Sequence, residues 1–202
     1  MARDLRPKHK LCRKFGEKLC DSPKCPITKR NYPSGQHGQT SKRNKVSGFG
    51  KQLREKQKVK GIYGLLERQF SNYVAEASRK TGDTSKYLLS YLESRLDNVV
   101  YRAGFSPSRA AARQTVSHGH IFVNGKKVNI PSYRVRVGET IEIKESARKS
   151  KKYENLAELI TKKELPAWVT VDTKKLSAKI LNSPTIENPN FDANAIIGFY
   201  SR

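Results

Sequence analysis

Three cysteines, Cys12, Cys20 and Cys25, lie close together near the N-terminus and are the only ones in the chain. An odd number of cysteines cannot all pair in disulfides, and clustering of this kind is typical of metal ligands or of unpaired thiols. The first residues, MARDLRPKHK, lack the apolar stretch of a signal peptide, and no run of about 18 apolar residues indicates a membrane span. We therefore expect a reducing, cytoplasmic environment for these thiols.

A second set of residues suited to binding is basic and lies in the middle of the chain. Arg109 and Arg113 are four residues apart, so on a helix they share one face. Ser106 and Ser108 would lie at the N-terminal end of that helix, where the helix dipole favours phosphate oxygens. The following segment adds further groups that would contact a nucleic-acid backbone: His120, Lys126, Lys127, Arg134 and Arg136.

The whole chain is strongly basic, with 41 Lys and Arg against 18 Asp and Glu and a net charge of +23 over 202 residues. Residues 1–60 hold 18 basic and 4 acidic residues, and residues 101–150 hold 10 and 3. Nucleic acid is the commonest polyanion that offsets such charge, and the basic blocks lack the apolar face of a membrane-binding helix. We expect RNA rather than DNA, because the shallow minor groove and phosphate surface of A-form RNA suit recognition by shape.

Helical periodicity predicts the elements that precede these basic residues. Segments 48–61 and 65–80 favour helix, and the second has apolar residues at helical spacing. Asp83 or Thr84 can cap a third helix, whose apolar residues recur every three or four positions to about Ala103. These helices would pack on one another through their apolar faces.

A short helix and a hairpin are predicted next. Ser106 as N-cap, Pro107 in the first turn and Gly119 after the last turn define a helix over 107–118. Asn124-Gly125 is the preferred pair of a type I′ turn, so the alternating residues around it predict a β-hairpin. Further predicted elements are strands over 134–137 and 140–143, a basic helix over 146–163, a strand over 168–171 and a loop over 182–194.

Several of these residues together resemble a known RNA-binding module, the one named after the fourth protein of the small ribosomal subunit. The module also occurs on pseudouridine synthases, tyrosyl-tRNA synthetases and a heat-shock protein, so it does not decide the function alone. The resemblance is carried by Ser108-Arg109, Ala112-Arg113, Gly119-His120-Ile121, Val123-Asn124-Gly125 and Tyr133-Arg134-Val135.

The rest of the chain resembles the bacterial or organellar family of that ribosomal protein itself. The resemblance covers nearly the whole chain and is weakest over 145–195. It is carried outside the module by YPSGQHG at 32–38, LREKQK at 53–58, IYG at 62–64, ERQF at 67–70, LESRLDNVVYR at 92–102 and the terminal FYSR.

This resemblance implies an α+β fold in three parts. Residues 1–45 would form a basic N-terminal segment with a zinc knuckle. Residues 46–92 would form a helical subdomain, joined by the C-terminal tail 193–202. Residues 93–192 would form an RNA-binding subdomain of two helices and an antiparallel sheet, with the module core at 93–155.

The resemblance also implies a structural constituent of the small ribosomal subunit on the cytoplasmic ribosome, not an enzyme. Family members bind the 5′ domain of small-subunit (16S) rRNA, nucleate assembly and lie near the mRNA entry path, where they affect translational accuracy; some bind their own mRNA. Expected partners are this rRNA, neighbouring small-subunit proteins and mRNA, with no membrane and no small-molecule substrate. The RNA contacts carried over are Arg54, Lys56, Lys58, Arg68, Arg109 and Arg113, with His37 on a Gly-rich loop as an RNA-packing candidate.

The family bears on the metal question as well. Zinc-bearing members use four cysteines near the N-terminus, whereas here His9 stands where the first cysteine is expected, ahead of Cys12, Cys20 and Cys25. Tetrahedral zinc accepts an imidazole beside three thiolates, and such a site would order a segment that has little apolar periodicity. We expect one zinc ion; the alternatives are three unligated thiols or an iron–sulfur cluster.

Two other function classes are alternatives to a ribosomal protein. An RNA-modifying enzyme with this module needs a separate catalytic domain, for which the residues after the module leave no room. His118 and His120 have no nucleophile with a paired base beside them, which argues against catalysis. A free-standing RNA-binding regulator or chaperone would differ in not co-sedimenting with the small subunit at high salt.

Overall fold

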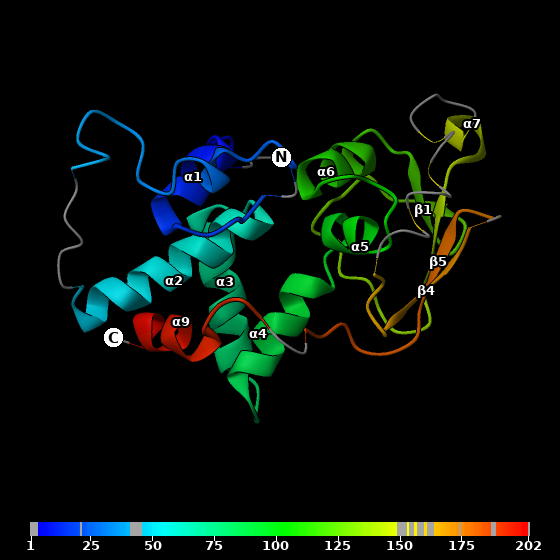
Figure 1. Cartoon of the computed structure of the whole chain (residues 1–202). Coiled ribbons are helices and arrows are strands. Elements are labelled where there is room, and N and C mark those ends of the chain that lie inside the picture. Colours follow the sequence, from blue (N-terminus) through cyan, green and yellow to red (C-terminus); the bar gives the residue numbers. More distant parts are fainter. Residues whose placement is uncertain are drawn as a thin grey trace. The chain divides into compact units, whose positions relative to one another are not determined.

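The computed structural model describes residues 4–20, 22–40, 46–148, 153, 156, 160, 164–173, 175–186 and 189–201 (Figure 1). The chain divides into two compact units, Met1–Leu88 with Asn188–Arg202, and Leu89–Glu187. The three-part division expected from the sequence stays a prediction. Among the described residues, no helix combines the length and apolarity needed to cross a membrane.

The first unit is built from helices. Ser47 begins α2 (Gly48–Tyr63) by accepting a hydrogen bond from the Gly50 amide at 3.2 Å, and Gly64, with a φ of 66°, ends it. The C-terminal helix α9 (Ala193–Tyr200) lies against α2 (Figure 1), where the rings of Phe199 and Phe49 are 5.4 Å apart. The other helices are α1 (Lys8–Phe15), the 3-10 helix η1 (Pro26–Thr28), α3 (Glu67–Ser78) and α4 (Thr84–Glu93), whose residues are divided between the units.

The second unit packs helices against an antiparallel sheet of five strands, in the order β2-β1-β3-β5-β4. This arrangement confirms the predicted α+β class. The helices whose bounds lie in its described residues are α5 (Leu96–Arg102), α6 (Arg109–Ser117) and α7 (Glu145–Arg148). Its strands are β1 (Ile121–Val123), β2 (Lys126–Lys127), β3 (Thr140–Ile143), β4 (Val169–Asp172) and β5 (Ser177–Ile180).

One face of the sheet forms the core of the second unit. Ile121 faces Ile143 across β1 and β3, and Val123 faces Ile141, which faces Ala178 of β5. Because successive side chains of a strand point to opposite faces, these alternate residues are the buried ones. From the helical side the same core includes Leu96, Val99, Val100, Ala112 and Val116.

The helix predicted from residue 84 to about residue 103 is wrong in one respect, because it is interrupted between α4 and α5. Arg95 has an extended backbone, with φ −64° and ψ 134°, and pairs with Arg134 in an isolated antiparallel bridge. The Ser94 carbonyl accepts a hydrogen bond from the Val135 amide at 2.8 Å. Strand-like pairing with a distant segment therefore overrides the helical preference of this sequence.

Helix α6 begins later than predicted. Ser108 and not Ser106 is its N-cap, since Ser108 Oγ accepts a hydrogen bond from the Ala111 amide at 3.2 Å. Ser106 is buried, with its Oγ 3.5 Å from Thr115 Oγ1. Gly119 has the predicted left-handed conformation after the helix, with a φ of 70°.

The predicted strands are confirmed in part. Asn124 and Gly125, with φ values of 48° and 75°, form the predicted turn between β1 and β2. The expected strand over 134–137 is wrong apart from the bridge at Arg134. Strand β5 was not predicted, because the residues between β4 and β5 carry no clear turn signal. Of the basic helix expected over 146–163, the structure contains α7, and most of the remainder lies outside the described residues.

Candidate nucleic-acid interface and metal centre

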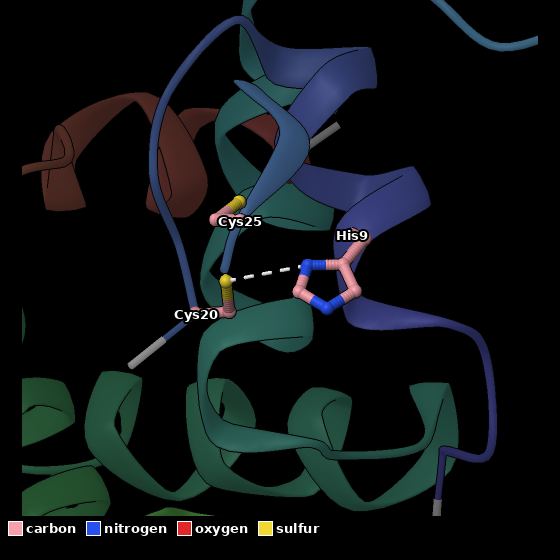
Figure 2. Close-up of side chains that lie close together, drawn as sticks. All are labelled: His9, Cys20 and Cys25. Carbon is pink, nitrogen blue, oxygen red and sulfur yellow. Dashed lines mark hydrogen bonds between the residues drawn. The ribbon is translucent and has the colours of Figure 1, made fainter. Parts of the chain in front are cut away.

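His9, Cys20 and Cys25 gather in the first unit, as Figure 2 shows. A ring nitrogen of His9 and the two sulfur atoms lie within 4.8 Å of one another, and Cys20 Sγ is 3.7 Å from His9 Nδ1. His9 comes from α1, and Cys25 is the residue before η1. The fold therefore brings together three predicted metal ligands from α1 and from the segment between α1 and η1.

Cys12, the fourth predicted ligand, is fully buried beside this group without belonging to it. Its Sγ accepts a hydrogen bond from the Leu19 amide at 3.3 Å, and its side chain packs with Cys25 and Ile27. The three cysteines, all of which the structure describes, form no disulfide. Three thiols and one imidazole are a donor set that fits a structural zinc site.

The two thiols nearest His9 differ in acidity. Burial, with a hydrogen bond to Cys25, raises the pKa of the Cys20 thiol to about 12. Burial acts on Cys25 in the same direction, but the Ile27 amide and the His9 and Cys20 side chains outweigh it and lower the pKa of Cys25 to about 7. Of these two thiols Cys25 is therefore the more acidic, and the thiolate is the form that binds metal.

The loop that carries His37 is held by α1. Arg13 donates from Nε to the Tyr32 carbonyl at 2.9 Å and from Nη2 to the Pro33 carbonyl at 3.0 Å. Gly38 closes the loop, where a Cβ atom would collide with the Pro33 carbonyl oxygen. Within this constrained loop the His37 side chain is exposed.

Lys56, predicted as a phosphate contact, is instead buried in a network within the first unit. Its Nζ is 2.8 Å from Glu67 Oε1 and 4.2 Å from the centre of the Phe199 ring. Glu67 also accepts hydrogen bonds from Lys60 Nζ and the Tyr200 hydroxyl, each at 2.7 Å. Burial acts to raise the pKa of Glu67, but the two lysines and Tyr200 outweigh it and lower this pKa to about 2.

Two other cations of α2 also contact their own unit. Lys58 is buried, with its Nζ 2.6 Å from Glu17 Oε2. Arg54 is exposed, and its Nη2 donates to the Phe15 carbonyl at 2.8 Å. Arg68 is exposed on α3. The predicted cations of this unit thus divide into two at the surface and two, Lys56 and Lys58, that are buried and pair with half-exposed carboxylates.

Arg113 on α6 is buried as well, although its spacing from Arg109 predicted a phosphate contact. Its Nη1 is 3.0 Å from Asp97 Oδ2, and the same oxygen is 2.8 Å from Nη2 of the fully buried Arg95. Asp97 lies in the first turn of α5, so this cluster ties α6 to the start of α5. In this geometry Arg113 pairs with a buried carboxylate and joins α6 to α5.

A second buried carboxylate, that of Glu93 at the end of α4, is bound by two residues of α5. Arg102 donates to Glu93 from Nε at 2.9 Å and from Nη2 at 3.1 Å. Asn98 Nδ2 donates to Glu93 Oε2 at 2.9 Å, and Asn98 Oδ1 accepts from Arg109 Nε at 2.8 Å. The Arg109 guanidinium also lies 4.5 Å from the centre of the Tyr101 ring.

The predicted RNA contacts at the surface of the second unit lie at the start of α6 and around the hairpin. Ser108 and Arg109 are half-buried in the first turn of α6. The Lys127 side chain passes over Gly119, where a Cβ atom would meet it. Half-buried or exposed side chains here are Ser108, Arg109, His120, Lys126, Lys127 and Arg134.

Sequence reasoning missed the buried carboxylates Glu93 and Asp97 and the amide of Asn98. All three are almost fully buried, and each binds an arginine or holds one in place. A signal was present, because LESRLDN places polar residues inside a segment whose apolar periodicity indicates a core helix. Buried charges are normally paired, so that pattern would have predicted an internal ion cluster.

Two protein-family models match consecutive parts of this chain. Residues 3–93 match the family described as "Ribosomal protein S4/S9 N-terminal domain", and residues 94–141 match the "S4 domain". Small ribosomal subunit protein uS4 of Halothermothrix orenii is 48% identical over 210 aligned residues, which cover 100% of both chains. The uS4 protein of Syntrophomonas wolfei is 49% identical with 95% of both chains covered, and uS4A of Symbiobacterium thermophilum is 50% identical with 100% of both covered.

Proposed function

Since this chain belongs to the uS4 family of small ribosomal subunit proteins, we propose that it is a structural constituent of that subunit. Its place is on the ribosome, and its family is one of structural proteins rather than enzymes. The observation that carries this proposal is similarity close to 50% identity along 95–100% of the length of the relatives. A net charge of +23 is consistent with a polyanionic partner.

The RNA partner that we propose is the 5′ domain of small-subunit (16S) rRNA, where the chain would nucleate assembly. The match of residues 94–141 to the S4 domain supports this, together with the surface cations at the start of α6 and on the hairpin. Contacts of this kind go mainly to phosphate and sugar and fix the position of the protein on the RNA. The contact set is Arg54, Arg68, Ser108, Arg109, His120, Lys126, Lys127, Arg134 and His37, whereas Lys56, Lys58, Ser106 and Arg113 support the fold.

Further roles in this proposal rest on family membership. The chain would contact neighbouring small-subunit proteins and lie near the mRNA entry path, where it would affect translational accuracy. Binding to its own mRNA would add autoregulation.

The test of the RNA partner is a binding titration of the full chain against 5′-domain RNA and against tRNA, across a salt series. We expect selective binding to the 5′ domain that survives moderate salt. Log affinity should fall with log salt by about 0.9 per neutralised phosphate, as counterions are released. Equal affinity for both RNAs, lost at moderate salt, would mean that the charge acts without selectivity and would overturn the proposal.

We also propose that His9, Cys12, Cys20 and Cys25 hold one zinc ion. Three of these residues already converge, and the lowered pKa of Cys25 makes one thiolate available. Bound zinc would supply a cross-link between α1 and the segment before η1. A Cys₃His set favours zinc over an iron–sulfur cluster, which usually has four thiolates.

Elemental analysis of the purified chain tests this metal site. We expect about one zinc per chain in the wild type, a large loss in His9→Ala and Cys20→Ser, and no loss in His37→Ala, whose histidine is exposed outside the cluster. Iron in place of zinc would indicate a cluster. An absence of metal in both the wild type and His9→Ala would contradict the site.

A further inference from the structure

Two residues of α5 determine the direction of the Arg109 side chain. Arg109 Nε donates to Asn98 Oδ1 at 2.8 Å, and its guanidinium lies 4.5 Å from the centre of the Tyr101 ring. A hydrogen bond at Nε and a ring against one face together restrain the plane of a guanidinium group. Arg109 is thus a held cation at the start of α6.

Asn98 can hold Arg109 only while its oxygen faces that residue, and Glu93 keeps it there. Asn98 Nδ2 donates to the Glu93 carboxylate at 2.9 Å and to the Glu93 backbone carbonyl at 3.1 Å. Both partners accept hydrogen bonds only, so the amide nitrogen of Asn98 must face Glu93. The opposite end of the amide, Oδ1, is then directed at Arg109.

Glu93 is in turn fixed by Arg102. The carboxylate is completely buried, and Arg102 binds both of its oxygens, at 2.9 and 3.1 Å. Such charge-assisted bonds are strong where water is excluded. Arg102, Glu93, Asn98 and Arg109 therefore form one continuous chain of polar contacts.

We propose that Asn98 is a positioning residue for RNA binding, which orients Arg109 toward a phosphate at the N-terminus of α6. Glu93 and Tyr101 act with it, through the contacts described above. Ser108 caps α6 and places Arg109 in its first turn, where the positive end of the helix dipole adds to the attraction for phosphate. A guanidinium that is already oriented loses less conformational entropy on binding. This inference rests on the proposed rRNA-binding function.

A double-mutant cycle on the full chain tests the proposal with 5′-domain RNA at one moderate salt concentration. We expect Asn98→Ala to weaken binding about fivefold, although the charge of the chain is unchanged, and to have less than about a twofold effect in an Arg109→Ala background. A general structural defect would weaken both backgrounds equally. Lys126→Ala serves as the matched background, in which Asn98→Ala should keep its full effect.

A second double-mutant cycle is needed because Asn98 is buried, so Asn98→Ala could fail to fold. Tyr101→Leu leaves Glu93 and Asn98 unchanged, removes the ring beneath Arg109 and keeps an apolar side chain against the core, so it should show the same dependence on Arg109. Urea unfolding identifies any variant that fails to fold. If Asn98→Ala is such a variant, the Tyr101 cycle tests whether the contacts to Arg109 affect RNA binding through Arg109. Additive losses would overturn the proposal, whereas a wild type that binds without selectivity would overturn the rRNA-binding function itself.

Discussion

Glu67 is the residue whose charge connects three helices of the first unit. It accepts hydrogen bonds from Lys56 and Lys60 of α2 and from Tyr200 of α9, while it begins α3 itself. The sequence shows that Lys56 is basic, but not that its ammonium lies against Phe199 with a carboxylate beside it. Such burial depends on residues more than a hundred positions apart, so it could not be predicted from local spacing.

The lowered pKa of Glu67 makes a prediction about stability and pH. Because this pKa falls from 4.5 to about 2 on folding, the carboxylate stabilises the fold fully above about pH 4.5, and this contribution is lost as the pH falls toward 2. We expect Glu67→Gln to lower the free energy of unfolding by about 1 kcal/mol at neutral pH.

Urea unfolding of Glu67→Gln and the wild type at neutral pH and near pH 3 measures this effect. The difference between the two should shrink at the lower pH, because the unfolded chain, where this pKa is 4.5, binds a proton near pH 3 that the folded carboxylate does not yet bind. Glu164→Gln, which alters an exposed carboxylate of the other unit, should change little at either pH. A Glu67→Gln difference that stays constant with pH would contradict this role for the charge.

Among the elements, those with strong local signals were predicted best. The Asn124-Gly125 turn, the left-handed Gly119 and helices α2 and α3 depend on nearby residues, and all are confirmed. The break at Arg95 depends on pairing with Arg134, and the internal role of Arg113 depends on Asp97 of another helix. Both features come from tertiary contacts that periodicity does not contain.

Arg113, which joins α6 to α5, and Lys126, which is exposed on β2, should differ in how much each contributes to stability. Arg113→Ala leaves buried Asp97 with one arginine fewer, so we expect the free energy of unfolding to fall by roughly 2–4 kcal/mol. Lys126 is exposed on β2, so Lys126→Ala should change stability by less than about 0.5 kcal/mol.

Urea unfolding together with the salt dependence of RNA binding separates these two roles. The salt slope should flatten by about 0.9 in Lys126→Ala and stay unchanged in folded Arg113→Ala. A flattened slope in Arg113→Ala, with an unchanged slope in Lys126→Ala, would contradict this prediction and place Arg113 among the phosphate contacts.

At the scale of the whole molecule, basic side chains serve two purposes. Some, such as Arg95 and Lys56, are buried and pair with a carboxylate inside their own unit, and the exposed remainder supplies the excess charge. The family was recognisable from motifs spread along the whole chain, whereas the division of labour among its cations required the structure. A chain with this excess charge should be most stable when bound to a large polyanion.

The measurement that tests the central claim most directly is sedimentation of a tagged, full-length chain from cell extract through a high-salt sucrose gradient. A structural constituent of the small subunit should co-sediment with that subunit at close to one copy per particle, and resist the salt wash. A free-standing regulator held only by nonspecific charge would instead remain at the top of the gradient, because salt removes the counterion-release contribution to its binding. That result would contradict the account.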